Sequence, residues 1–87
     1  MIQYYWNIGS QPARAVKALL DIGKINHECI VIDLLNNKTR TPEYLKLNPL
    51  GQVPFIITAD NHKIGESNAI LIYLCSKYPK ELGRYNG

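Results

Sequence analysis

A serine two residues before a proline, Ser10 and Pro12, marks the predicted start of a helix after an apolar opening segment. Serine is a good N-cap residue, and proline fits the first helical turn. The free N–H groups and the positive end of the helix dipole attract an anion there, and the hydroxyl can donate a hydrogen bond to it. A thiolate is such an anion. Lowering a thiol pKa by about two units takes about 2.7 kcal/mol, which is the order that one hydroxyl and one helix terminus supply.

Ser10 lacks the neighbouring base that a nucleophilic serine needs. His27 and His62 fall in strand-like segments and form no acid–histidine–serine pattern with it. We therefore expect Ser10 to be a hydrogen-bond donor as well as a helix cap. Arg14, one turn into the helix, would either add positive potential or form a structural ion pair, and we favour the structural role.

Two further segments could hold a peptide-like ligand. Pro54 stands at the start of a predicted strand. If the Val53–Pro54 bond were cis, the Val53 backbone could pair with a ligand as one rung of a sheet, although the residues alone favour a trans bond. Glu66 and Ser67 stand at another predicted helix N-terminus, where they could hold an ammonium and a carboxylate of an amino-acid head group. The plainer reading of Ser67 is a helix cap.

The predicted elements that carry these residues follow the order β-α-β-α-β-β-α. Ser10 caps the first helix and Gly23 ends it at the C′ position. A helix between the first two strands implies a parallel pair with a right-handed crossover, and a later hairpin makes the sheet mixed. The sequence thus predicts an α/β fold with a four-stranded mixed sheet and flanking helices. The predicted strands cover residues 1–7, 27–33, 53–58 and 62–65, and the later helices cover 42–47 and 68–78.

The last predicted helix is apolar on nearly all sides. A sheet can cover only one side of it, so we expect the second to meet another domain, another chain or a second copy. The alternative is that loops and the C-terminal tail cover it. One stripe consists of Ile70, Leu71, Leu74 and Tyr78, and the other of Ala69, Ile72, Tyr73 and Ser76.

Three stretches in this order resemble the N-terminal, thioredoxin-like domain of cytosolic glutathione transferases, and the first looks most like the theta class. They are Ser10-Gln11-Pro12-Ala13-Arg14-Ala15, then Thr41-Pro42-Glu43-Tyr44 with Asn48-Pro49-Leu50-Gly51-Gln52-Val53-Pro54, and Glu66-Ser67-Asn68-Ala69-Ile70. The resemblance covers almost the whole chain. It implies a transferase that adds the thiol of glutathione to a small electrophile in detoxification. Relatives continue as an all-helical domain, which is absent from residues 1–87. The resemblance therefore implies that residues 1–87 form one glutathione-binding domain.

The resemblance also implies roles for individual residues. Ser10 would donate to the glutathione sulfur, and Val53, before a cis Pro54, would pair with the cysteinyl backbone. Tyr5 on the first strand is an alternative donor, because tyrosine-using classes keep theirs on that strand. The remaining contacts would come from Glu66 and Ser67 at the γ-glutamyl end, Gln52 near the glycyl end, Arg40 as a substitute there, and Gln11. Many relatives have lysine in place of Gln52 and histidine in place of Thr39.

Composition narrows the partners further. The chain carries a net charge of +3 from singly spread basic residues, which suits a small anionic ligand and not nucleic acid. No apolar run is long enough to cross a membrane, and no secretory signal opens the chain. Cys29 and Cys75 form no disulfide framework, so we expect a cytoplasmic protein. His27 and Cys29 share one side of a strand, but two ligands do not make a metal site.

Two other functions compete with the transferase. The same fold serves as an assembly module in translation factors and tRNA synthetases, where its helices dock partners, so a non-catalytic interaction module is the alternative. A thiol–disulfide oxidoreductase is disfavoured, because Ser10 and Ala13 occupy the positions of a redox cysteine pair.

Overall fold

The computed structural model of the chain describes residues 1–36 and 38–82, and it contains one four-stranded mixed sheet in the order β2-β1-β3-β4. β1 (Ile2–Trp6) pairs in parallel with β2 (His27–Val31). β3 (Phe55–Ile57) lies antiparallel to both β1 and β4 (Lys63–Gly65). The predicted α/β class, the parallel first pair and the later hairpin are confirmed.

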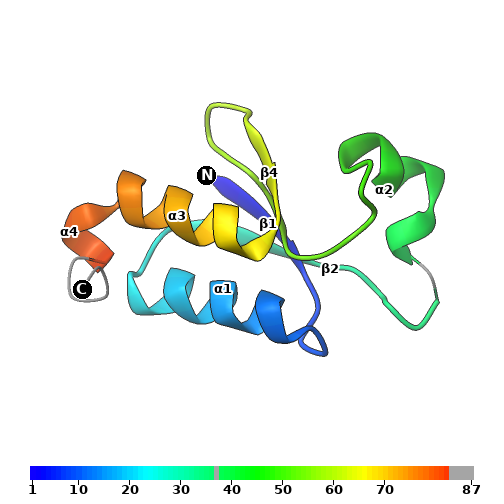
Figure 1. Cartoon of the computed structure of the whole chain (residues 1–87), viewed down its shortest axis with the longest axis horizontal. Coiled ribbons are helices and arrows are strands. Elements are labelled where there is room, and N and C mark those ends of the chain that lie inside the picture. The colour runs from blue at the N-terminus through cyan, green and yellow to red at the C-terminus, as the bar shows by residue number, and fades with distance from the viewer. Residues whose placement is uncertain (37, 83–87) are drawn as a thin grey trace.

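The helices divide between the two faces of the sheet (Figure 1). α1 (Gln11–Ile22) and α3 (Ser67–Lys77) lie side by side on one face, and the short α4 (Pro79–Leu82) follows α3. On the other face, the 3-10 turn η1 (Lys38–Arg40) precedes α2 (Pro42–Leu47). No helix in the described ranges is long and apolar enough to span a membrane.

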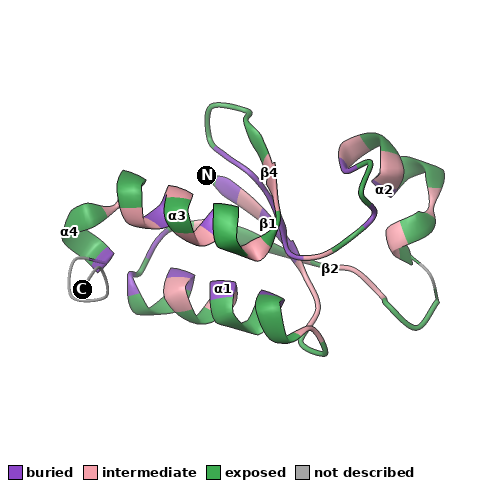
Figure 2. Cartoon of the chain, viewed as in Figure 1, coloured by how far each residue is buried: buried purple, intermediate pink, exposed green. Residues whose placement is uncertain are grey.

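Strand β1 supplies side chains to an apolar core on each face, because successive strand residues point in opposite directions. Tyr4 is fully buried in the core beneath α1 and α3, which is built around Leu20 and Leu74. Tyr5 points the other way and packs with Tyr44 of α2 in a smaller core. Figure 2 shows the corresponding pattern, with buried residues on the inner turns of α1 and α3 and exposed residues on their outer turns.

The end of α1 differs from the prediction. The predicted C′ residue, Gly23, is instead the C-cap with a φ of −79°, and Lys24 after it takes the left-handed conformation, with a φ of 51°. Gly23 is required for space: an added Cβ would lie 2.7 Å from Leu82 Cδ2. The helix predicted over residues 68–78 ends close to that point, but Pro79 then opens the unpredicted α4, whose Leu82 lies beside Gly23.

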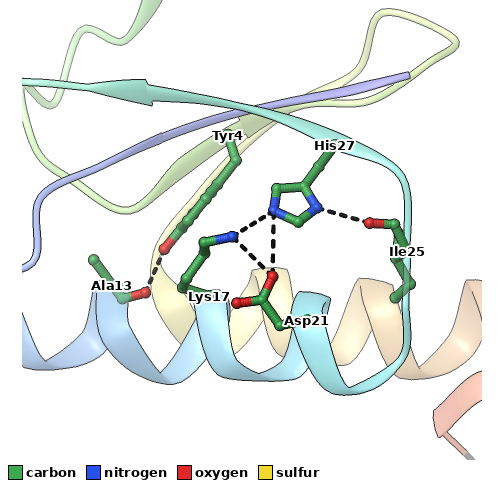
Figure 3. Close-up of polar contacts among 6 residues, drawn as sticks. All are labelled: Tyr4, Ala13, Lys17, Asp21, Ile25 and His27. Atoms are coloured by element: carbon green, nitrogen blue, oxygen red, sulfur yellow. Dashed lines mark hydrogen bonds and ion pairs between the residues drawn. The ribbon is translucent and has the colours of Figure 1, made fainter.

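A polar cluster fixes α1 to strand β2 (Figure 3). Lys17 Nζ donates to Asp21 Oδ1 at 2.8 Å and contacts His27 Nε2 at 3.0 Å. His27 Nδ1 lies 2.7 Å from the Ile25 carbonyl oxygen, which can only accept, so Nδ1 carries the proton and Nε2 accepts from Lys17. His27 is thus a structural residue that orients the helix on which Ser10 stands.

Only one side of α3 is covered by the rest of the described chain. Ile70 and Leu74 are fully buried, whereas Ile72 is 68 % exposed. A shallow hollow of about 430 Å³ opens on this outer side, between Leu71 and Cys75. The two stripes differ from the predicted ones, because Leu71 lines the outer hollow and Tyr73 packs against the core. The alternative cover, the C-terminal tail, lies outside the described residues.

Candidate functional site

Ser10 is the N-cap of α1, as predicted. Its backbone is extended, and its Oγ accepts from the Ala13 N–H at 3.3 Å. Since that contact uses the oxygen as an acceptor, the hydroxyl proton is free to be donated to a ligand. The Tyr4 hydroxyl donates to the Ala13 carbonyl, which holds the first turn of α1 against β1 (Figure 3).

The loop before Ser10 is held by Asn7, which sequence reasoning missed. The Asn7 side chain donates to the Ile32 carbonyl at 2.9 Å and accepts from the Gly9 N–H at 2.8 Å. The Asn7 carbonyl also accepts from the Ser10 N–H at 3.0 Å. An asparagine two residues before a glycine at a strand end is a turn signal that could have identified it.

The Val53–Pro54 bond is cis. The trans bond that the residues alone favoured is wrong, and the cis bond implied by the family resemblance is right. The missed information is long-range, because no local residue pattern near Pro54 distinguishes the two isomers. Val53 is partly buried, and its N–H has no backbone partner among the described residues.

Two buried polar residues support the loop that carries Val53. The Gln52 carbonyl accepts from the Tyr44 hydroxyl at 2.7 Å and from Asn48 Nδ2 at 2.9 Å. Burial raises the pKa of Tyr44, so its hydroxyl stays a donor at neutral pH. Gly51 adopts a φ of 61°, and a Cβ there would lie 2.9 Å from the Thr39 carbonyl oxygen. The sequence analysis assigned no role to the Asn48 side chain.

Glu66, and not Ser67, is the N-cap of α3, which corrects the prediction. Ser67 is the first helical residue, and Glu66 forms no side-chain cap. The Glu66 backbone has φ 68° and ψ 122°, a combination that a residue with a Cβ rarely adopts. Such outliers concentrate at ligand-binding positions. The first helical hydrogen bond of α3 runs from the Ile70 N–H to the Glu66 carbonyl, so the earlier N–H groups stay available.

These segments meet in a cleft of about 190 Å³, which is lined by Pro12, Gln52, Val53, Pro54, Glu66 and Ser67. It brings together the first turn of α1, the cis-proline loop and the N-terminus of α3. Both helix ends direct positive potential toward it, and the first turn of α1 contains no acidic residue to offset this. Glu66 also lines the cleft, so the cleft offers both signs of charge.

The remaining predicted residues lie outside the lining of this cleft. Ser10 and Gln11 directly precede Pro12, and Gln11 is exposed. Arg40 is exposed on η1, and its Nη1 would lie 3.1 Å from a Cβ on Gly51, which places the guanidinium beside the turn that precedes Gln52. Tyr5 is 8 % exposed in the core on the opposite face and lines no part of the cleft. Its placement opposes a role as the thiolate donor.

Arg14 has a structural contact as favoured, but its Nη1 donates to the Ile8 carbonyl at 3.1 Å instead of forming an ion pair. Among residues 1–36 and 38–82, no cluster of three or more histidine, cysteine or acidic side chains could hold a metal ion.

The strand order, the cis-proline loop and the helix N-termini beside it define a thioredoxin-like domain. The chain belongs to the family described as "Glutathione S-transferase, N-terminal domain", whose family model matches residues 1–76.

Similar proteins include plant and human theta-type transferases. Glutathione S-transferase T3 of Arabidopsis thaliana is 41 % identical over 78 residues, which cover 90 % of this chain and 13 % of the plant protein. Glutathione S-transferase T1 of the same plant is 38 % identical over 78 residues, which cover 90 % of this chain and 31 % of that protein. Human glutathione transferase theta-2, crystallised with glutathione, superposes with a TM-score of 0.90 at 32 % identity, over 100 % of this chain and 35 % of the human chain. The chain thus spans about a third or less of the length of these relatives.

Proposed function

We propose that this domain is the glutathione-binding part of a glutathione S-transferase that activates the glutathione thiol for conjugation to a small electrophile. The observation that carries the proposal is the cleft in which the first turn of α1, Val53 and the Glu66–Ser67 pair meet. The glutathione-bound structure of human theta-2 at a TM-score of 0.90 supports the same ligand.

In this proposal, the tripeptide lies along the cleft with its cysteinyl backbone against Val53. The available N–H groups at the start of α3, with the Ser67 hydroxyl, hold the γ-glutamyl carboxylate. The Glu66 carboxylate binds the neighbouring ammonium. Gln52 faces the glycyl end, with Arg40 and Gln11 near the two sides of the cleft.

The glutathione sulfur then sits at the start of α1, where Ser10 donates its free hydroxyl proton as a hydrogen bond. That bond and the helix dipole favour the thiolate, so the thiol proton is lost to solvent near neutral pH. The sulfur electron pair forms the new bond to the electrophilic carbon, and the leaving group departs with its own bonding pair. Ser10 remains protonated throughout and forms no covalent intermediate.

The exposed side of α3 is the proposed contact for a helical domain or for a second copy of the chain. Apolar surface centred on Ile72 supports this assignment. A cytoplasmic location and a detoxifying role belong to the same proposal. The free thiols of Cys29 and Cys75 suit a reducing compartment.

Thermal unfolding with and without glutathione tests the proposal. Ligand at about ten times its Kd stabilises the folded state by about 1.4 kcal/mol, which raises the midpoint of a small domain by roughly 6–10 °C. Ser67→Ala should reduce this increase, whereas the matched change Ser76→Ala, on the same helix away from the cleft, should not. An unchanged midpoint at saturating glutathione, together with a stable complex with another protein, would favour the assembly module instead.

A further inference from the structure

A second and larger cavity lies on the opposite face of the sheet from α1 and α3. It has a volume of about 450 Å³ and opens between the end of β2, η1 and α2. Small-molecule sites commonly enclose about 300–1,000 Å³ and have mainly apolar and aromatic walls. We call this space the α2 cavity. None of the residues proposed to bind glutathione lines it.

The walls of the α2 cavity form a preorganised aromatic and aliphatic surface. Tyr5 and Tyr44 lie with ring centroids 5.9 Å apart at an interplanar angle of 57°, and Phe55 packs against both rings. Ile32 and Leu47 line the cavity and are only partly buried in the small core. A flat apolar ring system could therefore cover surface that the chain itself leaves open.

The polar groups of the α2 cavity restrict the ligand further. The hydroxyl of Tyr5 forms no hydrogen bond with another described residue, although the side chain is only 8 % exposed. Burial raises the pKa of this phenol, so it is a neutral donor at physiological pH. Solvent still reaches the Tyr5 oxygen, so a ligand oxygen that accepts from this hydroxyl would replace water as its partner.

The charges at the mouth of the α2 cavity disfavour an anionic ligand. Lys38 is offset by Asp33 and Glu43, which also line it. Asp33 already accepts from the Leu35 N–H at 2.9 Å and from the Asn36 amide. An anion would therefore meet two carboxylates for one ammonium. A neutral carbonyl oxygen avoids this repulsion and can still accept from the Tyr5 hydroxyl.

The α2 cavity is also connected to the proposed glutathione cleft. Tyr44 forms one of its walls, and the hydroxyl of the same residue donates to the Gln52 carbonyl at 2.7 Å. Gln52 directly precedes Val53, and both line the cleft. A ligand that reorients the Tyr44 ring would therefore act on the loop that holds glutathione.

We propose that the α2 cavity is a second binding site for a flat, uncharged aromatic molecule with a carbonyl oxygen, and that its occupancy changes glutathione affinity through Tyr44. The first part stands independently of the proposed function, whereas the coupling rests on it.

Xanthone, a rigid uncharged tricyclic ketone, and xanthene, its analogue without the carbonyl, are the probes that test the site. Amide chemical shifts followed by NMR should change around Tyr5 and Leu47, and xanthone should bind roughly threefold to tenfold tighter than xanthene. Tyr5→Phe should remove that difference while xanthene binding stays the same. Leu47→Trp, which fills the cavity, should abolish binding of both probes, and Ser10→Ala should change neither.

Three results would overturn the site: no shifts, shifts confined to α3 or to the glutathione cleft, or an undiminished xanthone preference in Tyr5→Phe. The coupling is tested by measuring the glutathione Kd with and without saturating xanthone. We expect at least a threefold change that Tyr44→Phe eliminates, and an unchanged Kd would overturn the coupling. Xanthone binding without any glutathione binding would contradict the proposed function and leave the second site intact.

Discussion

At the residue scale, the proposed chemistry depends on single side chains that combine a structural and a functional task. Ser10 Oγ accepts from the Ala13 N–H and keeps its proton for a ligand. Glu66 instead gives up a favourable backbone conformation, with a φ of 68°, to stand at the start of α3. Ser10 therefore stabilises the fold at its position, whereas Glu66 costs the fold some stability.

Replacing Glu66 with glycine separates these two tasks. A strained backbone costs a non-glycine residue about 1–3 kcal/mol of folded-state stability, and glycine avoids this strain. Part of the resulting gain is lost, because glycine increases the conformational entropy of the unfolded chain. We therefore expect Glu66→Gly to keep or raise the free energy of unfolding, by up to about 1 kcal/mol. Glutathione affinity should fall, because the ammonium partner is gone.

Urea unfolding and calorimetric titration with glutathione measure the two effects. Glu66→Gln is the control, because it retains the side-chain length and the strained backbone while losing the charge. A loss of stability in the glycine variant would show that Glu66 is not strained.

Tyr4 gives a prediction about alkaline pH. Burial, and secondarily Cys29, raise the Tyr4 pKa well above its ordinary value of about 10. Because the folded-state pKa is the higher one, the contribution to stability is complete below about pH 10 and is lost as the pH rises further. The slope from one such proton is about 1.4 kcal/mol per pH unit.

We expect the unfolding free energy to fall steeply above about pH 10 and to fall less steeply in Tyr4→Phe. Tyr4→Phe should also be less stable at neutral pH, because the Ala13 carbonyl loses its donor. Urea unfolding across this pH range provides the measurement. Equal slopes in the two proteins would contradict the assignment to Tyr4.

Residue types predicted part of the candidate site, and tertiary contacts determined the rest. The Ser10 cap followed from a local rule, since serine before a helical proline needs no long-range information. The same rule failed for α3, where it predicted Ser67 as the N-cap and the structure has Glu66. A glutamate with positive φ occurs at such a position only where tertiary contacts impose that backbone conformation. The roles of Tyr44 and Asn48 were missed, because both side chains donate to the Gln52 carbonyl across the loop between α2 and β3. No local residue pattern indicates that this loop folds back onto α2.

At the element scale, the hydrophobic pattern predicts the strands of the sheet well, but it does not predict where the helices end. The strands and the parallel first pair were predictable, because apolar alternation and a crossover helix specify them. α4 was missed because Pro79 ends a helix as readily as it opens one. Gly23 was predicted as the C′ residue of α1, whereas packing against Leu82 explains the need for glycine there.

Gly23→Ala tests that explanation. Alanine is compatible with a φ of −79°, so the cost should come from the clash with Leu82 and amount to about 1–3 kcal/mol of unfolding free energy. In a Leu82→Ala background, where the clashing methyl group is absent, the same change should cost close to nothing. Chemical denaturation of the four proteins gives the coupling energy, and additive effects would show that Gly23 matters for another reason.

At the scale of the whole molecule, the chain presents one face that its own described residues do not cover. The outer side of α3 exposes Ile72 beside a shallow hollow, and the relatives that the chain matches are about three times longer or more. The fold thus places the proposed glutathione cleft at the ends of the central strands β1 and β3 and apolar surface on the outer side of α3.

Ile72→Glu should therefore reduce self-association of the chain at high concentration. Its free energy of unfolding should change by less than about 0.5 kcal/mol, because the side chain is mainly exposed. Sedimentation velocity over a concentration series measures the association. Ala59→Glu, an equal charge change at an exposed turn, is the control, and equal behaviour of the two variants would contradict a role for the α3 face.

The pKa of the glutathione thiol when bound to the chain tests the central claim most directly. It can be followed by the ultraviolet absorbance of the thiolate as a function of pH, in the wild-type protein and in Ser10→Ala. We expect the bound thiol to titrate about two units below its free value of about 8.5 in the wild type, and to return most of the way toward that value in Ser10→Ala. A bound thiol that titrates at the same pH with and without the Ser10 hydroxyl would contradict the account.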